Sequence, residues 1–174
     1  MEKNIMLKAF GALDRELREK AQILIGGGAA MLLAHHVPLS TMDIDGVLFK
    51  SALTPAQMDP LIKKVGSELK IGAHWFNDYI NTFTYTIPPD FRSRLVTVYK
   101  GKMLTVLALG KEELLIMKCF SGREKDVGHA RALIKKGADI DFVESHLGKL
   151  EEKGLPGAKE AKSFLRDIID SMEA

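Results

Sequence analysis

The feature that most constrains the fold is an apolar run that breaks into three consecutive glycines. Residues 21–25 (Ala-Gln-Ile-Leu-Ile) have the composition of a buried β-strand, Gly26-Gly27-Gly28 follows, and residues 29–36 are typical of a short helix. A strand, tight turn and helix N-terminus in this order expose backbone N–H groups, whose attraction for anions the helix dipole increases. The sequence therefore predicts a phosphate-binding turn at the three glycines.

A pair of acidic residues follows within the next predicted strand. Asp43 and Asp45 are separated by Ile44 in a strand expected from about residue 42 to residue 50, and alternate residues of a strand lie on the same face. Two carboxylates on one face repel each other unless a proton, solvent or a cation separates them, and Mg²⁺ held together with phosphate oxygens is the usual divalent solution. The glycine turn and the acidic pair together indicate chemistry on a nucleoside triphosphate.

The rest of the pattern predicts an α+β fold. Residues 4–20 and the segment from Thr54-Pro55 to Leu69 have helical periodicity, and β-rich runs flank Lys100-Gly101 as two strands or a hairpin. Residues 74–87 fit either a helix or a strand, and beyond Gly110 only helical patterns occur. We therefore expect a mixed β-sheet flanked by helices in residues 1–109 and a helical C-terminal region, residues 110–174, packed on that core.

Composition narrows the class of protein. The formal net charge of +2, from 25 basic and 23 acidic residues, does not indicate a nucleic-acid binder. A single cysteine, Cys119, excludes a disulfide framework and fits a reducing compartment. The sequence has neither an apolar run of membrane-spanning length nor the pattern of a secretory signal. We therefore expect a cytoplasmic protein with no membrane partner.

Five blocks, taken in order, resemble the nucleotidyltransferase superfamily with the DNA polymerase β-like fold. They span about residues 20–135 and are Gly26-Gly27-x-Ala29, Thr41-x-Asp43-Ile44-Asp45, Trp75-Phe76-Asn77-Asp78, Pro89-x-Phe91-x-x-Arg94 and Lys118-x-x-x-x-Arg123-Glu124-Lys125-Asp126. Within the superfamily the chain is most similar to small AbiEii-toxin-like proteins and to uncharacterised prokaryotic nucleotidyltransferases. One position departs from the pattern, because Leu39 stands two residues before Thr41, where these families commonly have a basic residue.

The resemblance implies an enzyme that transfers a nucleoside monophosphate from an NTP to an acceptor hydroxyl, with Mg²⁺ or Mn²⁺ as cofactor. It implies that Asp43 and Asp45 ligate the metal, and Asp78 is the expected further catalytic carboxylate, with Asp90 as the other candidate. The implied nucleotide-binding residues are Gly26, Gly27, Thr41, Lys118 and Arg123. The acceptor stays open between a tRNA, a protein and a small molecule, and the likeness to toxins adds a cognate antitoxin as a partner to consider.

Two other interpretations remain open. If no third carboxylate approaches Asp43, the chain would be a silent module that binds a nucleotide or RNA without turnover, with membership of a toxin–antitoxin pair as one form of this alternative. Gly26-x-Gly28, with an acidic residue 17 to 19 positions later, also imitates a dinucleotide-binding fingerprint. Against that second interpretation, Met31 occupies the position of the third glycine.

Several conspicuous residues also have structural explanations. Lys118 could be a solvated lysine on the flank of its helix, and Asp126 near a helix N-terminus suits the dipole without any function. Asp139, in a second Asp-Ile-Asp tripeptide, is expected to cap a helix. The aromatic residues that begin with Trp75 and Phe76 are expected in the core, and no histidine spacing suggests a zinc site.

Overall fold

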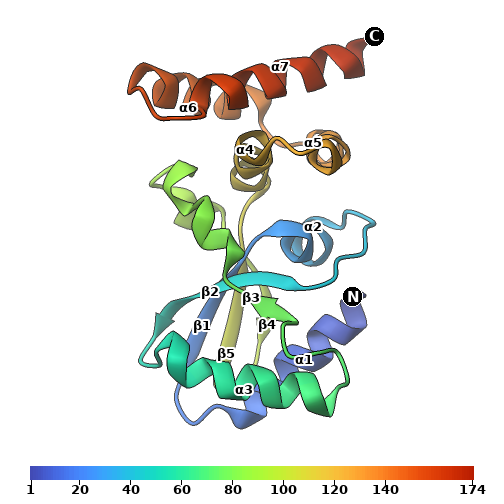
Figure 1. Cartoon of the computed structure of the whole chain (residues 1–174), viewed down its shortest axis with the longest axis vertical. Helices are drawn as coiled ribbons and strands as arrows, with labels where there is room; N and C mark the ends of the chain where they lie inside the picture. Colours follow the sequence, from blue (N-terminus) through green and yellow to red (C-terminus); the bar gives the residue numbers. More distant parts are fainter. The chain divides into compact units, whose positions relative to one another are not determined.

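The computed structural model describes residues 1–174 and has a mixed α+β fold, which confirms the expected fold class (Figure 1). The chain divides into two compact units, residues 1–81 with 95–109 and residues 82–94 with 110–174. The elements of the first unit are α1 (Lys3–Glu16), β1 (Ala21–Ile25), α2 (Gly27–His35), β2 (Ile44–Ser51), α3 (Pro55–Glu68), β3 (Phe76–Asn77), β4 (Val96–Lys100) and β5 (Leu104–Ala108). The helices of the second unit are α4 (Lys111–Ser121), α5 (Glu124–Lys135), α6 (Ile140–Glu152) and α7 (Ala158–Glu173).

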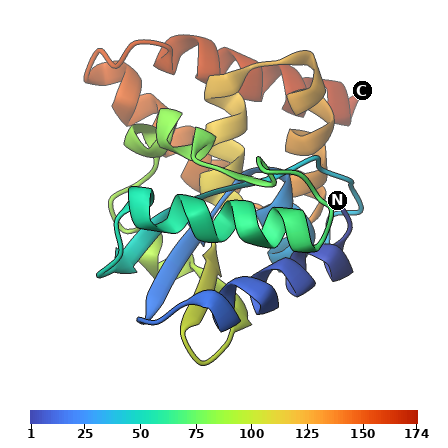
Figure 2. The ribbon, with the colours of Figure 1, turned by 60° about the horizontal axis from the view of Figure 1, so that its bottom comes forward.

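The first unit is built on a five-stranded sheet with the order β3-β2-β1-β5-β4. The central strand β1 pairs antiparallel with β2 and parallel with β5, and Ile23 and Ile25 within it are fully buried. Helices α1 and α3 lie side by side (Figures 1 and 2). The antiparallel pairing of β1 with β2 excludes the dinucleotide-binding interpretation, because that unit requires two parallel strands joined by its helix.

Local signals in the sequence account for several of the observed boundaries. Helix α3 begins with the predicted cap, in which the Thr54 hydroxyl accepts the N–H of Gln57 and the Gln57 side chain accepts the N–H of Thr54. The ambiguous segment, residues 74–87, resolves into the two-residue strand β3 and two short 3₁₀ helices, at residues 79–82 and 84–86. The periodicity was uninformative there because neither a long helix nor a long strand is present.

Asp14 ties α1 to the turn between β4 and β5. Its carboxylate accepts the backbone N–H groups of Leu104 at 2.7 Å, Met103 at 2.8 Å and Lys102 at 3.2 Å. Burial raises the pKa of Asp14, but these three hydrogen bonds outweigh it, so that the pKa lies below its ordinary value of 3.8. The carboxylate therefore stabilises the fold fully above that ordinary value and loses this contribution as the pH falls through the lowered pKa of the folded state.

We expect Asp14→Ala to lower the free energy of unfolding by about 1–3 kcal/mol at neutral pH, because it leaves backbone donors without their acceptor. The loss should shrink as the pH falls below the ordinary carboxyl pKa, because the unfolded wild-type chain then binds a proton that the folded chain does not yet bind. Urea unfolding at pH 7 and pH 3 measures both effects. Asp59→Ala, which removes an exposed carboxylate paired only with Lys63, is the control, and an equal loss in both variants would contradict the assigned role of Asp14.

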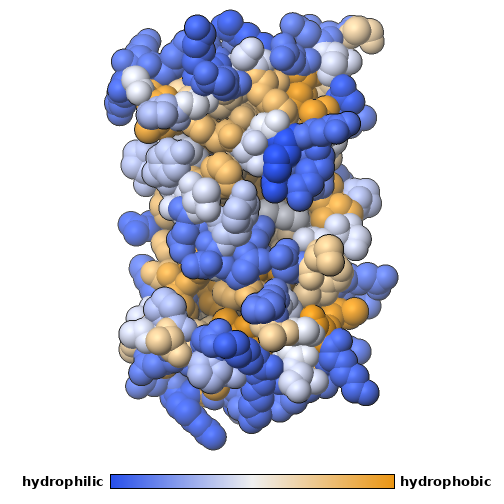
Figure 3. Space-filling view, in the orientation of Figure 1, coloured by the Kyte–Doolittle hydropathy of each residue, from blue (hydrophilic) through white to orange (hydrophobic).

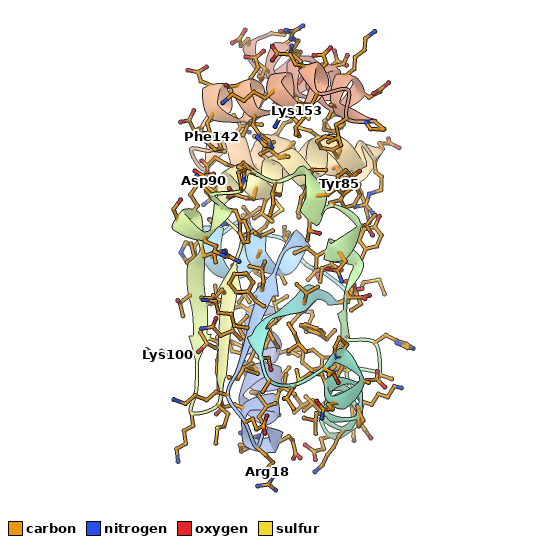
Figure 4. All side chains as sticks on the ribbon, turned by 90° about the vertical axis from the view of Figure 1, so that its left-hand side faces the viewer. Arg18, Tyr85, Asp90, Lys100, Phe142 and Lys153 are labelled. Carbon is orange, nitrogen blue, oxygen red and sulfur yellow. The ribbon has the colours of Figure 1, made fainter.

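The second unit is a group of helices in which α4 contacts each of the other three. Arg94, which precedes α4 in the chain, contacts three side chains of this unit. Its guanidinium binds the carboxylate of Asp90 and, at 2.7 Å, the buried carboxylate of Glu113. It also lies over the ring of Phe142 (Asp90 and Phe142 are labelled in Figure 4). The part of the α6 and α7 surface that is visible in Figure 3 is mostly hydrophilic. None of the seven α-helices combines the length and the apolar composition that a membrane span requires.

Candidate functional site

The turn after β1 favours glycine, because a Cβ at either of its first two glycines would come close to a neighbouring side chain. Gly27 has a φ of +56°, and a Cβ there would collide with the Asp45 carboxylate. At Gly26 a Cβ would lie 2.6 Å from the side chain of Ile80. The backbone N–H of Gly26 donates to the carbonyl of Asp45 at 2.9 Å, so the turn is fastened directly to the strand that carries the acidic pair.

The N-terminus of α2 has the properties expected of an anion-binding turn. No side chain caps the helix at Gly26, and the N–H of Ala30 makes a hydrogen bond to the carbonyl of Gly26 at 3.1 Å. The N–H groups that precede Ala30 in the first turn have no partner within the helix. Together with the helix dipole they attract negative charge, so this end of α2 is suited to a phosphate.

The acidic pair lies at the start of β2, next to this turn. Asp43 and Asp45 are partly exposed, whereas Ile44 between them is fully buried, as expected for a strand with one face in the core. The Thr41 hydroxyl donates to the backbone carbonyl of Asp43 at 3.0 Å and thereby fixes the approach to the strand. A Cβ on Gly28 would lie 3.1 Å from the Thr41 side chain, which is a tight contact.

Asn77 is the residue that the sequence analysis missed. Strand β3 pairs parallel with β2, with Asn77 opposite Asp45, and the Asn77 Nδ2 group donates to Asp43 Oδ2 at 2.8 Å. The side chain from the neighbouring strand that contacts the acidic pair is therefore an amide. The Trp75-Phe76-Asn77-Asp78 block contained the signal, but a strand of two residues has no periodicity from which to infer which side chain faces Asp43.

Asp78 and Asp90 are the two candidates for a third carboxylate. Asp78 follows β3 directly and is exposed. Asp90 belongs to the second unit and binds Arg94, whose hydrogen bond lowers the pKa of Asp90 below its ordinary value. Within neither unit do three histidine, cysteine, aspartate or glutamate side chains form a group that could hold a metal ion. A catalytic role for Asp78 stays a prediction.

The chemistry of the acidic pair fits a magnesium ion. Mg²⁺ prefers oxygen ligands and is commonly held by one or two carboxylates, with water and substrate phosphates completing its coordination. Asp43 and Asp45 supply two carboxylates. Because Gly27 has no side chain, the Asp45 carboxylate can lie directly against the anion-binding turn. The site thus offers ligands for a cation and donors for phosphate at the same end of β2.

Lys118 and Arg123, expected to bind nucleotide, both contact Asp126 within the second unit. Lys118 Nζ lies 2.7 Å from Asp126 Oδ1 and Arg123 Nε lies 2.9 Å from Asp126 Oδ2. Burial alone would raise the pKa of Asp126, but hydrogen bonds from Arg123 and Lys118 hold it well below its usual range. Lys118 is only 8% exposed, so a contact between its ammonium group and a nucleotide would have to disrupt this pair.

The other conspicuous side chains have structural roles. His35 Nε2 lies 2.8 Å from the carbonyl oxygen of Leu109, and the buried Trp75 donates its indole N–H to the carbonyl of Ile62. Asp139 accepts the N–H of Phe142 as the N-cap of α6, which confirms the expected cap. Burial raises the pKa of the Cys119 thiol to about 12, so this cysteine is not an activated nucleophile.

A cavity of about 690 Å³ adjoins the acidic pair through Asn77. It lies between β2, α3 and the segment after β3, with apolar walls that include Leu48, Met58 and Phe76. Its polar lining includes Asn77 and Asp78, and no lysine, arginine or histidine lines it. The cavity is therefore suited to an apolar group with neutral or cationic polar substituents.

Comparison with known proteins identifies the family of this chain. Residues 6–162 match the family model described as "Nucleotidyltransferase of unknown function (DUF6036)". No curated protein and no solved structure gives a significant match. The matched segment includes the glycine turn, the acidic pair, Asn77 and the Lys118–Asp126 pair. The chain therefore belongs to the DUF6036 family of nucleotidyltransferases.

Proposed function

We propose that this protein transfers a nucleoside monophosphate from an NTP to a hydroxyl group of an acceptor, with Mg²⁺ or Mn²⁺. The observation that carries the proposal is the contact between Gly27 and Asp45, because it joins an acidic pair to an anion-binding turn. Membership of a nucleotidyltransferase family supports the same class of reaction.

In this proposal each group at the site has a physical task. Asp43 and Asp45 hold the cation, which offsets phosphate charge and lowers the pKa of the attacking hydroxyl. The N–H groups of the glycine turn bind phosphate oxygens, and Thr41 keeps the backbone of Asp43 in place. The acceptor oxygen forms a bond to the α-phosphorus, the bond from that phosphorus to the leaving oxygen breaks, pyrophosphate departs, and the proton of the hydroxyl passes to solvent.

We further propose that the acceptor binds in the cavity beside Asn77. A nucleic-acid acceptor presents a phosphate backbone and needs neutralising lysine or arginine side chains, and the cavity lining contains none. A small molecule or a peptide that brings an apolar group and a hydroxyl suits the cavity better than a tRNA does. This favours transfer to a neutral or cationic acceptor.

The test is transfer of label from each of the four α-³²P-labelled NTPs into a cell extract. We expect labelled product with Mg²⁺ or Mn²⁺, recovered in the small-molecule or protein fraction, and no product when EDTA removes the metal. NTP binding in a thermal-shift assay without any label transfer would instead support a silent nucleotide-binding module. Label in the RNA fraction would contradict the proposed class of acceptor, and absence of both binding and transfer would overturn the proposal.

A further inference from the structure

The side chain of Asn77 is held at both ends. Its Nδ2 group donates to Asp43 Oδ2 at 2.8 Å, and its Oδ1 atom accepts the backbone N–H of Tyr79 at 3.0 Å. A backbone N–H can only donate, so the bond from Tyr79 establishes which end of the amide is oxygen. Asp43 therefore accepts a hydrogen bond from an N–H donor on β3, and the atom of Asn77 that faces Asp43 is a nitrogen and not an oxygen.

The position of Asn77 also relates it to Asp45. The two residues are opposite each other on parallel strands, and residues in register lie on the same face of a sheet. The face that holds the acidic pair thus carries two carboxylates and one neutral amide. Without a nucleotide, the formal charge that these three side chains offer a cation is −2.

We propose that Asn77 is a positioning residue that restricts the acidic pair to one divalent cation in the absence of nucleotide. The inference rests on the proposed function, since it takes Asp43 and Asp45 to be the cation ligands. Two divalent ions about 3.5–4 Å apart carry a total charge of +4. The two carboxylates, with a total charge of −2, neutralise only half of it. The amide adds no charge and occupies one oxygen of Asp43, so a second ion can bind only together with the phosphates of a nucleotide.

Titration with Mn²⁺ in the absence of nucleotide tests this proposal. Isothermal calorimetry should give one ion per chain for the wild type and two for Asn77→Asp, which places a third carboxylate at nearly unchanged size. Asn77→Ala should still bind one ion, about 10–100-fold more weakly, because the outer group that orients a ligand is lost. Asn81→Asp adds the same charge to an exposed residue of the same cavity and should leave the stoichiometry at one.

Thermal unfolding gives a second measurement that does not depend on activity. Asn77→Asp should melt below the wild type in EDTA, because its carboxylate faces that of Asp43, and Mn²⁺ should raise its melting temperature by more than it raises that of the wild type. Two ions bound by the wild type, or one ion bound with unchanged affinity by Asn77→Asp, would overturn the inference and leave the metal site intact. If folded wild type and Asn77→Asp both bind no Mn²⁺, the metal-dependent function fails as well.

Discussion

Replacing Asp45 by asparagine is expected to lower the rate of the proposed Mg²⁺-dependent nucleotidyl transfer by a factor on the order of a thousand. A bound cation contributes several kcal/mol of charge stabilisation in the transition state, and about 4 kcal/mol corresponds to a factor of a thousand in rate. The asparagine amide has nearly the size of the carboxylate that lies against Gly27, but it has no charge with which to hold the cation. The substitution should therefore lower the rate of transfer and leave the packing against Gly27 unchanged.

The initial rate of label transfer and the melting temperature in EDTA should be measured together. Removing one of two neighbouring carboxylates should leave the melting temperature of Asp45→Asn close to that of the wild type. The matched control is Asp141→Asn, in the second Asp-Ile-Asp tripeptide, where the side chain is exposed in the first turn of α6. An Asp45→Asn protein that keeps more than about a tenth of the wild-type rate would be incompatible with metal ligation by Asp45.

Replacing Asp126 by alanine is expected to lower the free energy of unfolding by about 3–5 kcal/mol, the usual cost of removing one partner of a buried ion pair. Asp126 is fully buried and Lys118 is 8% exposed, so the variant leaves an ammonium group with little access to water. Asp126 also accepts the backbone N–H of Arg123 at 3.2 Å, which helps to join α4 to α5. Arg123 is more exposed and can turn to solvent, whereas Lys118 cannot.

The pH dependence of this loss follows from the direction of the pKa shift. The pKa of Asp126 is lowered in the folded protein, so the stabilisation is fully present above the ordinary carboxyl pKa and is lost as the pH falls through the lowered value. In urea unfolding, the free energies of unfolding of Asp126→Ala and the wild type should therefore differ by the full amount at pH 7. Glu144→Ala, at an exposed ion pair with Arg166, is the control for the same unit.

A double variant separates charge burial from side-chain packing. Adding Lys118→Met to Asp126→Ala should recover much of the lost stability, because the uncompensated charge disappears with the lysine. If the double variant is no more stable than Asp126→Ala alone, the pair is not the source of the loss. NTP affinity measured on the same proteins also tests whether Lys118 binds nucleotide, a role that would require the ammonium group to leave Asp126.

The sequence was informative wherever a local signal determined the structure. The glycine run predicted the turn between β1 and α2, because both the positive φ of Gly27 and its contact with Asp45 disfavour a side chain at this position. The spacing of Asp43 and Asp45 predicted that they share a face, because strand geometry acts over two residues. These elements depend on a few neighbouring residues and therefore leave a readable pattern.

Side-chain contacts between different helices and strands left no such pattern. The parallel contact that brings Asn77 to Asp45 joins segments 32 residues apart through a two-residue strand, which is too short to show a period. The Lys118–Asp126 pair was equally hidden, since a lysine in an apolar helix can either reach solvent or be buried against a carboxylate. In both places tertiary packing, and not local propensity, decides which polar groups meet.

The contact between Gly27 and Asp45 links the evolutionary histories of two positions 18 residues apart. In a homologue that acquires a side chain at the first position, the carboxylate at the second position must move away or be replaced by a smaller side chain. Substitutions at these sites should therefore occur jointly across the family. Lineages that carry both changes would keep the fold and lack the acidic pair on which the proposed function depends.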